Sequence, residues 1–139
     1  MPVETALQRL LELAAEAPPG AIETLPLAAT DGRVLAENIV ADLDLPPWDN
    51  SAMDGYALRL ADWTGEPLTI SQRIFAGNAP VALTPGTCAR IFTGAPLPAG
   101  ADCVEMQENV ELLDNGRVRF KHPLKARQHI RPQGQETRR

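Results

Sequence analysis

Residues 46–56 read Pro46-Pro47-Trp48-Asp49-Asn50-Ser51-Ala52-Met53-Asp54-Gly55-Tyr56, a composition that neither a core strand nor a helix would have. The two prolines fix φ and remove backbone donors, and small or polar turn formers follow them. Two carboxylates, an amide and a hydroxyl therefore lie close together on a loop with little freedom, which is how polar ligand sites are often held. We expect this loop to be the centre of function.

The rest of the sequence has the composition of one modest domain that turns frequently. Its 139 residues are 44% hydrophobic and include 13 prolines and 10 glycines, which favours short strands over long helices. No apolar run approaches the roughly 20 residues that cross a bilayer, and the N-terminus lacks the features of a signal peptide. These features predict a cytoplasmic protein with no membrane partner.

Strand patterns follow the loop at regular intervals. The expected strands cover residues 56–60, 68–75, 88–92 and 103–107, and a hairpin joins 110–113 to 117–120. The hairpin contains Asn115-Gly116, a pair that can supply the two positive φ values of a type I′ turn. This spacing predicts a small, mainly antiparallel barrel or sandwich over residues 44–125.

Residues before the loop predict a helix and extended chain. Apolar residues three and four apart indicate an amphipathic helix over 3–17, ended by Pro18-Pro19-Gly20. Short extended segments, 22–28 and 37–41, flank an Asp31-Gly32 turn. We therefore expect an α+β protein: the helix and short extended segments in 1–43, the small β domain in 44–125, and in 126–139 an extended, polar segment that looks cut off.

Two places in the sequence could carry chemistry. Asp49 and Asp54 could share a Mg²⁺ ion, which favours carboxylate oxygens, or they could cap ordinary turns. In the stretch from Arg90 to Asp102, the Thr93 hydroxyl and the Gly94 amide could donate to an oxyanion, or Thr93 could satisfy its own turn.

The charges are unevenly distributed along the chain. Residues 1–114 hold 17 acids and five arginines, whereas residues 115–139 hold eight Lys or Arg and one acid. The basic segment could meet nucleic acid, an anionic small molecule or another part of the same polypeptide, although few aromatic residues accompany it for stacking on bases. The spacing of the cysteines and histidines, Cys88, Cys103, His122 and His129, matches no compact zinc framework.

The stretches 45–57 and 92–102 together closely resemble the molybdopterin molybdotransferase family, the MoeA proteins and the E domain of gephyrin. Both motifs are long and unusual in composition, and they occur in the family's order and approximate spacing. Residues 24–36 also resemble the family, so the resemblance covers nearly the whole chain. Family members are much longer, and the resemblance implies that this chain is an N-terminal fragment. By the same resemblance, residues 1–43 hold the helix and part of an extended linking domain, and residues 126–139 are the start of a return segment.

The resemblance implies a role in molybdenum cofactor biosynthesis. Such enzymes insert molybdenum from molybdate into adenylylated molybdopterin and release AMP, with help from a divalent cation such as Mg²⁺. Matching motif positions imply catalytic roles for Asp54 and Thr93, while the spacing of the carboxylates in the loop makes Asp54 and Asp49 the candidate metal ligands. The motif positions also imply substrate contacts by Asn50, Ser51 and Arg131, while Gln135-Glu136 stands where the family has two acids.

The resemblance also implies a composite active site. In the family, the cleft forms in a homodimer, with the small β domain of one subunit facing the molybdopterin-binding domain of the other, so this chain alone is expected to be inactive. Two alternatives stay open: a non-catalytic binding or scaffold module of the same family, and a stand-alone anion-binding β protein that uses its basic segment. No nucleic-acid partner is expected.

Overall fold

The structure, a computed structural model, describes residues 1–18 and 20–139. Pro19, one of the residues expected to end the first helix, lies outside the described residues. The chain divides into two compact units, Met1–Ile39 and Val40–Arg139.

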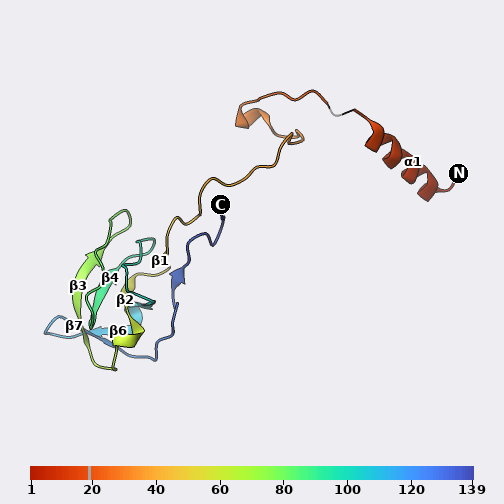
Figure 1. Cartoon of the computed structure of the whole chain (residues 1–139). Helices are drawn as coiled ribbons and strands as arrows, with labels where there is room; N and C mark the ends of the chain where they lie inside the picture. Colours follow the sequence, from red (N-terminus) through yellow and green to blue (C-terminus); the bar gives the residue numbers. More distant parts are fainter. Residues whose placement is uncertain (19) are drawn as a thin grey trace. The chain divides into compact units, whose positions relative to one another are not determined.

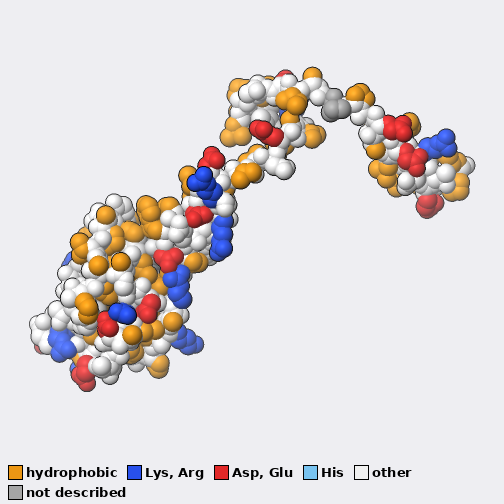
Figure 2. All heavy atoms as spheres, viewed as in Figure 1, with side chains coloured by type: hydrophobic (Ala, Val, Ile, Leu, Met, Phe, Trp, Pro, Cys, Tyr) orange, Lys and Arg blue, Asp and Glu red, His pale blue; other side chains and the backbone are white. Residues whose placement is uncertain are grey.

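The first unit contains a helix and a short helical turn. Helix α1 (Val3–Glu16) agrees with the predicted helix to within one residue. A 3-10 turn, η1 (Leu27–Ala29), interrupts chain that was expected to be extended, because the Thr30 hydroxyl donates to the Leu27 carbonyl at 2.7 Å and stabilises the turn. No residue of α1 is buried, so its apolar side chains are not covered by the rest of the first unit (Figure 2).

The second unit is built on a six-stranded sheet that curls into a half-barrel (Figure 1). Its strands lie in the order β5-β2-β4-β3-β7-β6, and every neighbouring pair is antiparallel except β3 and β4. The bounds fall within two residues of those predicted, which confirms the α+β class with a small, mainly antiparallel sheet. The strands are β2 (Gly55–Leu58), β3 (Leu68–Ile74), β4 (Thr87–Ile91), β5 (Cys103–Met106), β6 (Val110–Leu112) and β7 (Arg117–Phe120).

A bulge in β3 directs the two halves of this strand to opposite faces of the sheet. Ile70 pairs with Cys88 and Gln72 pairs with Ala89, which leaves Ser71 as an extra residue. In a regular strand Ile70 and Ile74 would point to the same side, because side chains alternate. With the extra residue, Ile70 packs in one hydrophobic cluster and Ile74 in another.

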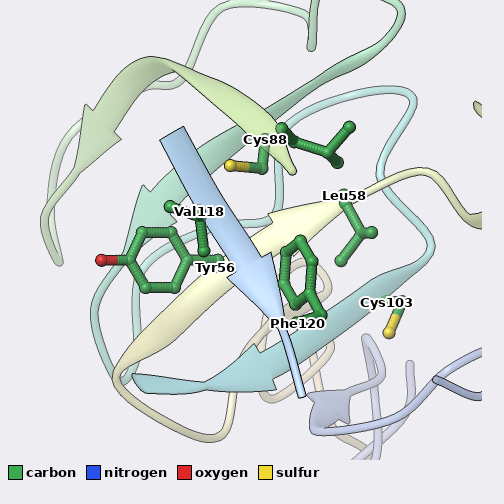
Figure 3. Close-up of a cluster of buried hydrophobic side chains, with 7 residues drawn as sticks. Tyr56, Leu58, Cys88, Cys103, Val118 and Phe120 are labelled. Carbon is green, nitrogen blue, oxygen red and sulfur yellow. The ribbon is translucent and has the colours of Figure 1, made fainter. Parts of the chain in front are cut away.

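Each face of the sheet carries its own hydrophobic core. The first core lies between the central strands and β7, and joins Tyr56, Leu58, Cys88, Cys103, Val118 and Phe120 (Figure 3). The second core is built on the small side chains of Ala57 and Ala89, which leave space for loop residues such as Ala95 and Leu97. Strand β2 is therefore buried on both faces, and it is paired along both edges, with β4 and β5.

A second, two-stranded sheet ties the end of the chain to the 46–56 loop. Strand β1 (Asn50–Ser51) pairs antiparallel with β8 (Ile130–Arg131). Further along, the Gly134 amide donates to the Pro46 carbonyl at 2.9 Å. Sequence reasoning foresaw neither strand, because two residues are too few to show an alternating pattern. Residues 126–139 thus pack within the second unit.

The predicted hairpin is present, but its turn differs from the prediction. Within residues 114–116 only Gly116 has a positive φ, 75°. The Gly116 amide donates to the Leu113 carbonyl at 2.8 Å, and the Asn115 side chain accepts from the Arg117 amide at 3.0 Å. This is a type I turn followed by a left-handed glycine, so the type I′ prediction is wrong. Asn115 stabilises the turn through its side chain and needs no left-handed backbone.

The position of Gly55 between two strands generates a stability prediction. A Cβ at Gly55 would lie 1.9 Å from the Glu105 carbonyl oxygen, so Gly55→Ala must push β2 and β5 apart. We expect this substitution to lower the free energy of unfolding by about 3 kcal/mol, measured by urea denaturation. Gly20→Ala is the control, since nothing lies within 4 Å of its Cβ position. Equal unfolding free energies for the two variants would contradict the assignment.

Candidate functional site

Four strands of the large sheet meet at one edge. Strands β3 and β4 are parallel, so their carboxyl ends lie together, and the antiparallel β2 begins beside them. Strand β5 is antiparallel to β2 and ends at the same place, where Gly55 pairs with both Ile91 and Met106. We call this the Asp54 edge, because Asp54 immediately precedes β2.

Asp54 and Thr93 are in direct contact at this edge. The Asp54 Oδ1 atom accepts hydrogen bonds from the Thr93 amide at 2.8 Å and from the Thr93 hydroxyl at 2.7 Å. Both bonds hold the pKa of Asp54 below its ordinary value of 3.8, and the bond from the Thr93 backbone amide has the larger effect. The charge of Arg90 also lowers this pKa. Asp54 is therefore an ionised, oriented carboxylate at neutral pH, and the two residues converge as the sequence predicted.

The Gly94 amide is used differently from the expectation that it would donate to an oxyanion. It donates to the Ser51 carbonyl at 2.8 Å, so the expectation is wrong for Gly94. Its backbone is left-handed, with φ of 79°, and the chain doubles back onto the loop there. The turn after β4 thus supports the loop with its glycine and contacts Asp54 with its threonine.

Two chain segments hold the loop from either side. On one side, the Leu97 amide donates to the Asp49 carbonyl at 2.9 Å, and the Ser51 amide donates to the Ala95 carbonyl at 3.0 Å. On the other side, the Ala52 amide donates to the His129 carbonyl at 2.9 Å. Because backbone groups make these bonds, the shape of the loop does not depend on flexible side chains.

Asp49 binds the return segment with both of its carboxylate oxygens. Its Oδ2 pairs with the Arg127 guanidinium at 2.6 Å, and its Oδ1 accepts the Gln133 amide at 2.8 Å. The hydrogen bond from Arg127 is the main reason that the pKa of Asp49 is lowered; burial opposes it, and the Gln133 bond adds to it. Because both oxygens are engaged, the geometry favours a structural role over direct metal ligation.

Basic residues near the end of the chain meet acidic groups of the same chain. Arg127 pairs with Asp49, and Arg131, a candidate substrate contact, forms an ion pair with Glu136. In the hairpin, Arg119 pairs with Glu111 at 2.8 Å. The sequence left nucleic acid, an anionic small molecule or another part of the same polypeptide as partners for the basic segment. The described contacts are with acidic residues of the same polypeptide.

Ser51 and Asn50 occupy different environments within the loop. Ser51 is fully buried, and its hydroxyl donates to the Met53 carbonyl at 2.5 Å, so it shapes the loop. Asn50 is 8% exposed, and its Oδ1 atom is buried without a hydrogen-bond partner among the described residues. A buried unpaired oxygen is costly, which singles out Asn50 as a polar group of the loop whose hydrogen bonding is incomplete among the described residues.

Glu105 is a supporting residue that sequence reasoning did not assign to the site. It is 1% exposed, and its carboxylate accepts hydrogen bonds from two side-chain amides, that of Asn109 at 2.8 Å and that of Gln128 at 2.7 Å. Gln128 is next to Arg127, so the buried carboxylate anchors the segment that holds Asp49. Gln128 is 23 residues away from Glu105 in sequence, so this contact left no local signal.

Arg90 was likewise missed, although it lies two residues before the second motif. Its Nη1 donates to the Gly55 carbonyl at 2.9 Å, and its Nη2 donates to the Gln107 side chain at 2.5 Å. Its Cζ lies 5.2 Å from the centre of the Tyr56 ring and 4.4 Å from that of Phe92. Arg90 therefore joins β2, β4 and the 3-10 turn η3 (Gln107–Asn109) at the Asp54 edge, and a charged residue in the otherwise apolar strand 88–92 was the available signal.

Other titratable groups do not build a second centre in the described structure. Burial raises the pKa of both Cys88 and Cys103 to about 12, so these thiols stay protonated. Within residues 1–18 and 20–139, no group of three His, Cys, Asp or Glu side chains could hold a metal ion. In the same residues, none of the helices has the length and apolar character that a membrane crossing requires.

Comparison with known proteins identifies close relatives in sequence. Residues 1–139 match a family described as the MoeA N-terminal region, domains I and II. The molybdopterin molybdenumtransferase of Synechococcus elongatus is 40% identical over 141 residues, which cover 96% of this chain and 34% of the relative. That of Haemophilus influenzae is 40% identical over 122 residues, covering 86% and 30%. The chain thus spans about a third of the length of these relatives.

Solved structures agree with this result. A molybdopterin biosynthesis MoeA protein from Pyrococcus horikoshii has a TM-score of 0.75 at 31% identity, covering 99% of this chain and 36% of that chain. Another structure of the Pyrococcus horikoshii protein gives 0.73 at 36% identity, covering 84% and 32%. The match extends from the first residue to the last and includes both motifs that meet at the Asp54 edge, so this chain belongs to the MoeA family, as its N-terminal region.

Proposed function

We propose that this chain supplies one wall of the active site of a molybdopterin molybdenumtransferase, an enzyme of molybdenum cofactor biosynthesis in the cytoplasm. The proposed reaction inserts molybdenum from molybdate into adenylylated molybdopterin and releases AMP. The names of the relatives support the reaction class. The observation that carries the assignment is the double hydrogen bond from Thr93 to the Asp54 carboxylate, because it joins the two motifs in one oriented group.

The Asp54 carboxylate suits a role beside phosphate groups. Cleavage of the adenylyl linkage develops negative charge on the AMP phosphate, and this charge must be neutralised by an oriented positive group. Thr93 fixes one oxygen of Asp54 and keeps the carboxylate ionised, while the Oδ2 atom makes no hydrogen bond among the described residues. In this proposal the Asp54 carboxylate binds a divalent cation through Oδ2, and the hydrogen bonds from Thr93 orient the carboxylate.

The donor set at the loop fits a divalent cation of the Mg²⁺ type. Asp54 offers a hard carboxylate oxygen, whereas the Asn50 amide oxygen, which has no partner among the described residues, is buried and would have to become accessible before it could bind a cation. Mg²⁺ commonly takes one or two protein carboxylates and completes its shell with phosphate oxygens and water, so one carboxylate is enough. When bound there, the cation would supply charge neutralisation on the phosphate oxygens. Asp49 is the less suitable ligand, since Arg127 and Gln133 occupy its oxygens.

The remainder of the site must come from other parts of the protein or from a second subunit. The chain spans about a third of the length of its relatives, and the carboxylate that it presents at the Asp54 edge is that of Asp54. We propose that the complete site forms in a homodimer and that this chain by itself does not catalyse insertion. Asn50 contacts the substrate in this proposal, Ser51 shapes the loop, and Arg131 reaches the substrate only after it leaves Glu136.

The assignment is tested in the gene product that contains this chain, through synthesis of active molybdenum cofactor from adenylylated molybdopterin and molybdate. We expect Asp54→Asn to lower the insertion rate about 100-fold, because it removes the charge that holds the cation. Asp114→Asn is the matched control, since it makes the same chemical change in an exposed hairpin turn. An insertion rate for Asp54→Asn equal to that of the control would remove Asp54 from the mechanism.

The Thr93 hydrogen bonds also predict a change in titration. We expect Thr93→Val to raise the pKa of Asp54 toward 3.8, but not fully, because the backbone hydrogen bond remains. Since the folded-state pKa is lowered, these bonds stabilise the fold fully above the unfolded value, and the stabilisation is lost as the pH falls through the folded pKa. Carbon-13 NMR of the Asp54 carboxyl group measures this directly. Identical titration curves for the wild-type and Thr93→Val chains would show that the hydroxyl does not orient the carboxylate.

A further inference from the structure

Two phenyl rings form an exposed stack beside the Asp54–Thr93 pair. Phe75 follows β3, and Phe92 follows β4, so both leave the sheet at the Asp54 edge. Their ring centres are 4.6 Å apart, and their planes differ by 10°. Phe75 is 49% exposed, whereas Phe92 is partly buried and precedes Thr93 directly in sequence. A large apolar ring is thus held at the surface next to a polar site.

Arg90 backs this stack with a fixed guanidinium group. It lies 4.4 Å from the centre of the Phe92 ring, while its nitrogens donate to the carbonyls of Gly55 and Ile91 and to the Gln107 side chain. These hydrogen bonds fix the position of the guanidinium group. The Phe92 ring thus contacts both the guanidinium group and the Phe75 ring. A layered arrangement of this kind binds a further planar ring on its outer member, because flat aromatic groups stack favourably face to face with an offset.

The backbone sets the position of the stack relative to Thr93. The Phe92 amide donates to the Ile74 carbonyl at 3.2 Å, which continues the parallel pairing of β3 and β4 by one step. The Asn78 amide then donates to the Phe75 carbonyl at 3.1 Å and closes a turn behind the ring. Phe75 is therefore held by backbone bonds at the end of β3, beside the end of β4 that leads to Thr93, although it is not part of either sequence motif.

We infer that Phe75, supported by Phe92 and Arg90, is a ring-stacking subsite that holds a fused heteroaromatic ring of the substrate while Asp54 faces its phosphates. This inference rests on the proposed function, whose substrate carries two such rings, the pterin and the adenine. Both are planar and stack on phenyl rings, so the shared chemistry is a flat nitrogen heterocycle joined to phosphate. Stacking contributes affinity without hydrogen bonds to the ring. The Asp54–Thr93 pair then determines which end of the bound molecule reacts.

The first test measures binding to the 139-residue chain itself, with AMP in one arm and pterin-6-carboxylate in the other. At millimolar probe concentrations we expect upfield ring-current shifts of the proton resonances of one probe and broadening of the Phe75 signals. Phe75→Leu keeps an apolar side chain but removes the ring, and should weaken binding about 10-fold. Phe75→Trp should restore it. The probe that binds identifies the ring, and binding of neither probe, or equal binding by Phe75→Leu, overturns the inference.

The second test separates this subsite from the proposed function. In the gene product that contains this chain, Phe75→Leu should raise the KM for adenylylated molybdopterin about 10-fold while kcat changes little, because stacking contributes equally to the ground and transition states. Leu112→Ala, at an exposed apolar residue of β6, is the control. If Asp54→Asn abolishes insertion but Phe75→Leu leaves KM unchanged, the result supports the proposed function and contradicts the ring-stacking subsite. If the gene product has no insertion activity, the function falls, while the binding test still decides the subsite.

Discussion

Strand β2 can lie between β4 and β5 only because Gly55 has no side chain, and the rest of the second unit depends on this close approach. The Glu105 carbonyl occupies the space that a Cβ at Gly55 would need. The resulting register places Gly55 opposite both Ile91 and Met106. As a consequence Asp54, one residue earlier, comes beside the turn that carries Thr93, and the Asp54 carbonyl accepts the Gln107 amide at 3.0 Å. A steric requirement in the sheet thus becomes the geometry of the candidate site.

The unequal charge of the two parts of the sequence has a structural explanation in the second unit. Asp49 lies in the acidic part and Arg127 in the basic part, and their ion pair is supported by the buried Glu105 through Gln128. Exposed ion pairs contribute little by themselves. Here the pair works together with backbone bonds between β1 and β8, so the charges specify where the return segment lies more than they stabilise it.

Local sequence patterns predicted the strands well and the connections poorly. Alternation and turn residues located the main strands because each signal lies within a few residues. The parallel pairing of β3 and β4, the extra residue Ser71 and the strands β1 and β8 depend on partners far away in sequence, which no local pattern records. At the site, Asp54 and Thr93 were found through their motifs. Glu105 and Arg90 were missed as supports, because their importance comes from burial and distant hydrogen bonds.

The double burial of β2 also determines how the site can be lost. An amide that is hydrogen-bonded between two neighbouring strands and covered on both faces exchanges with solvent only when the whole unit opens. Strand β2 meets these conditions along its length, and Asp54 is attached directly to its first residue. Local fraying therefore offers no route by which the Asp54 backbone departs while the sheet persists. Loss of the candidate site on heating and cooperative melting of the half-barrel are therefore expected to be the same event.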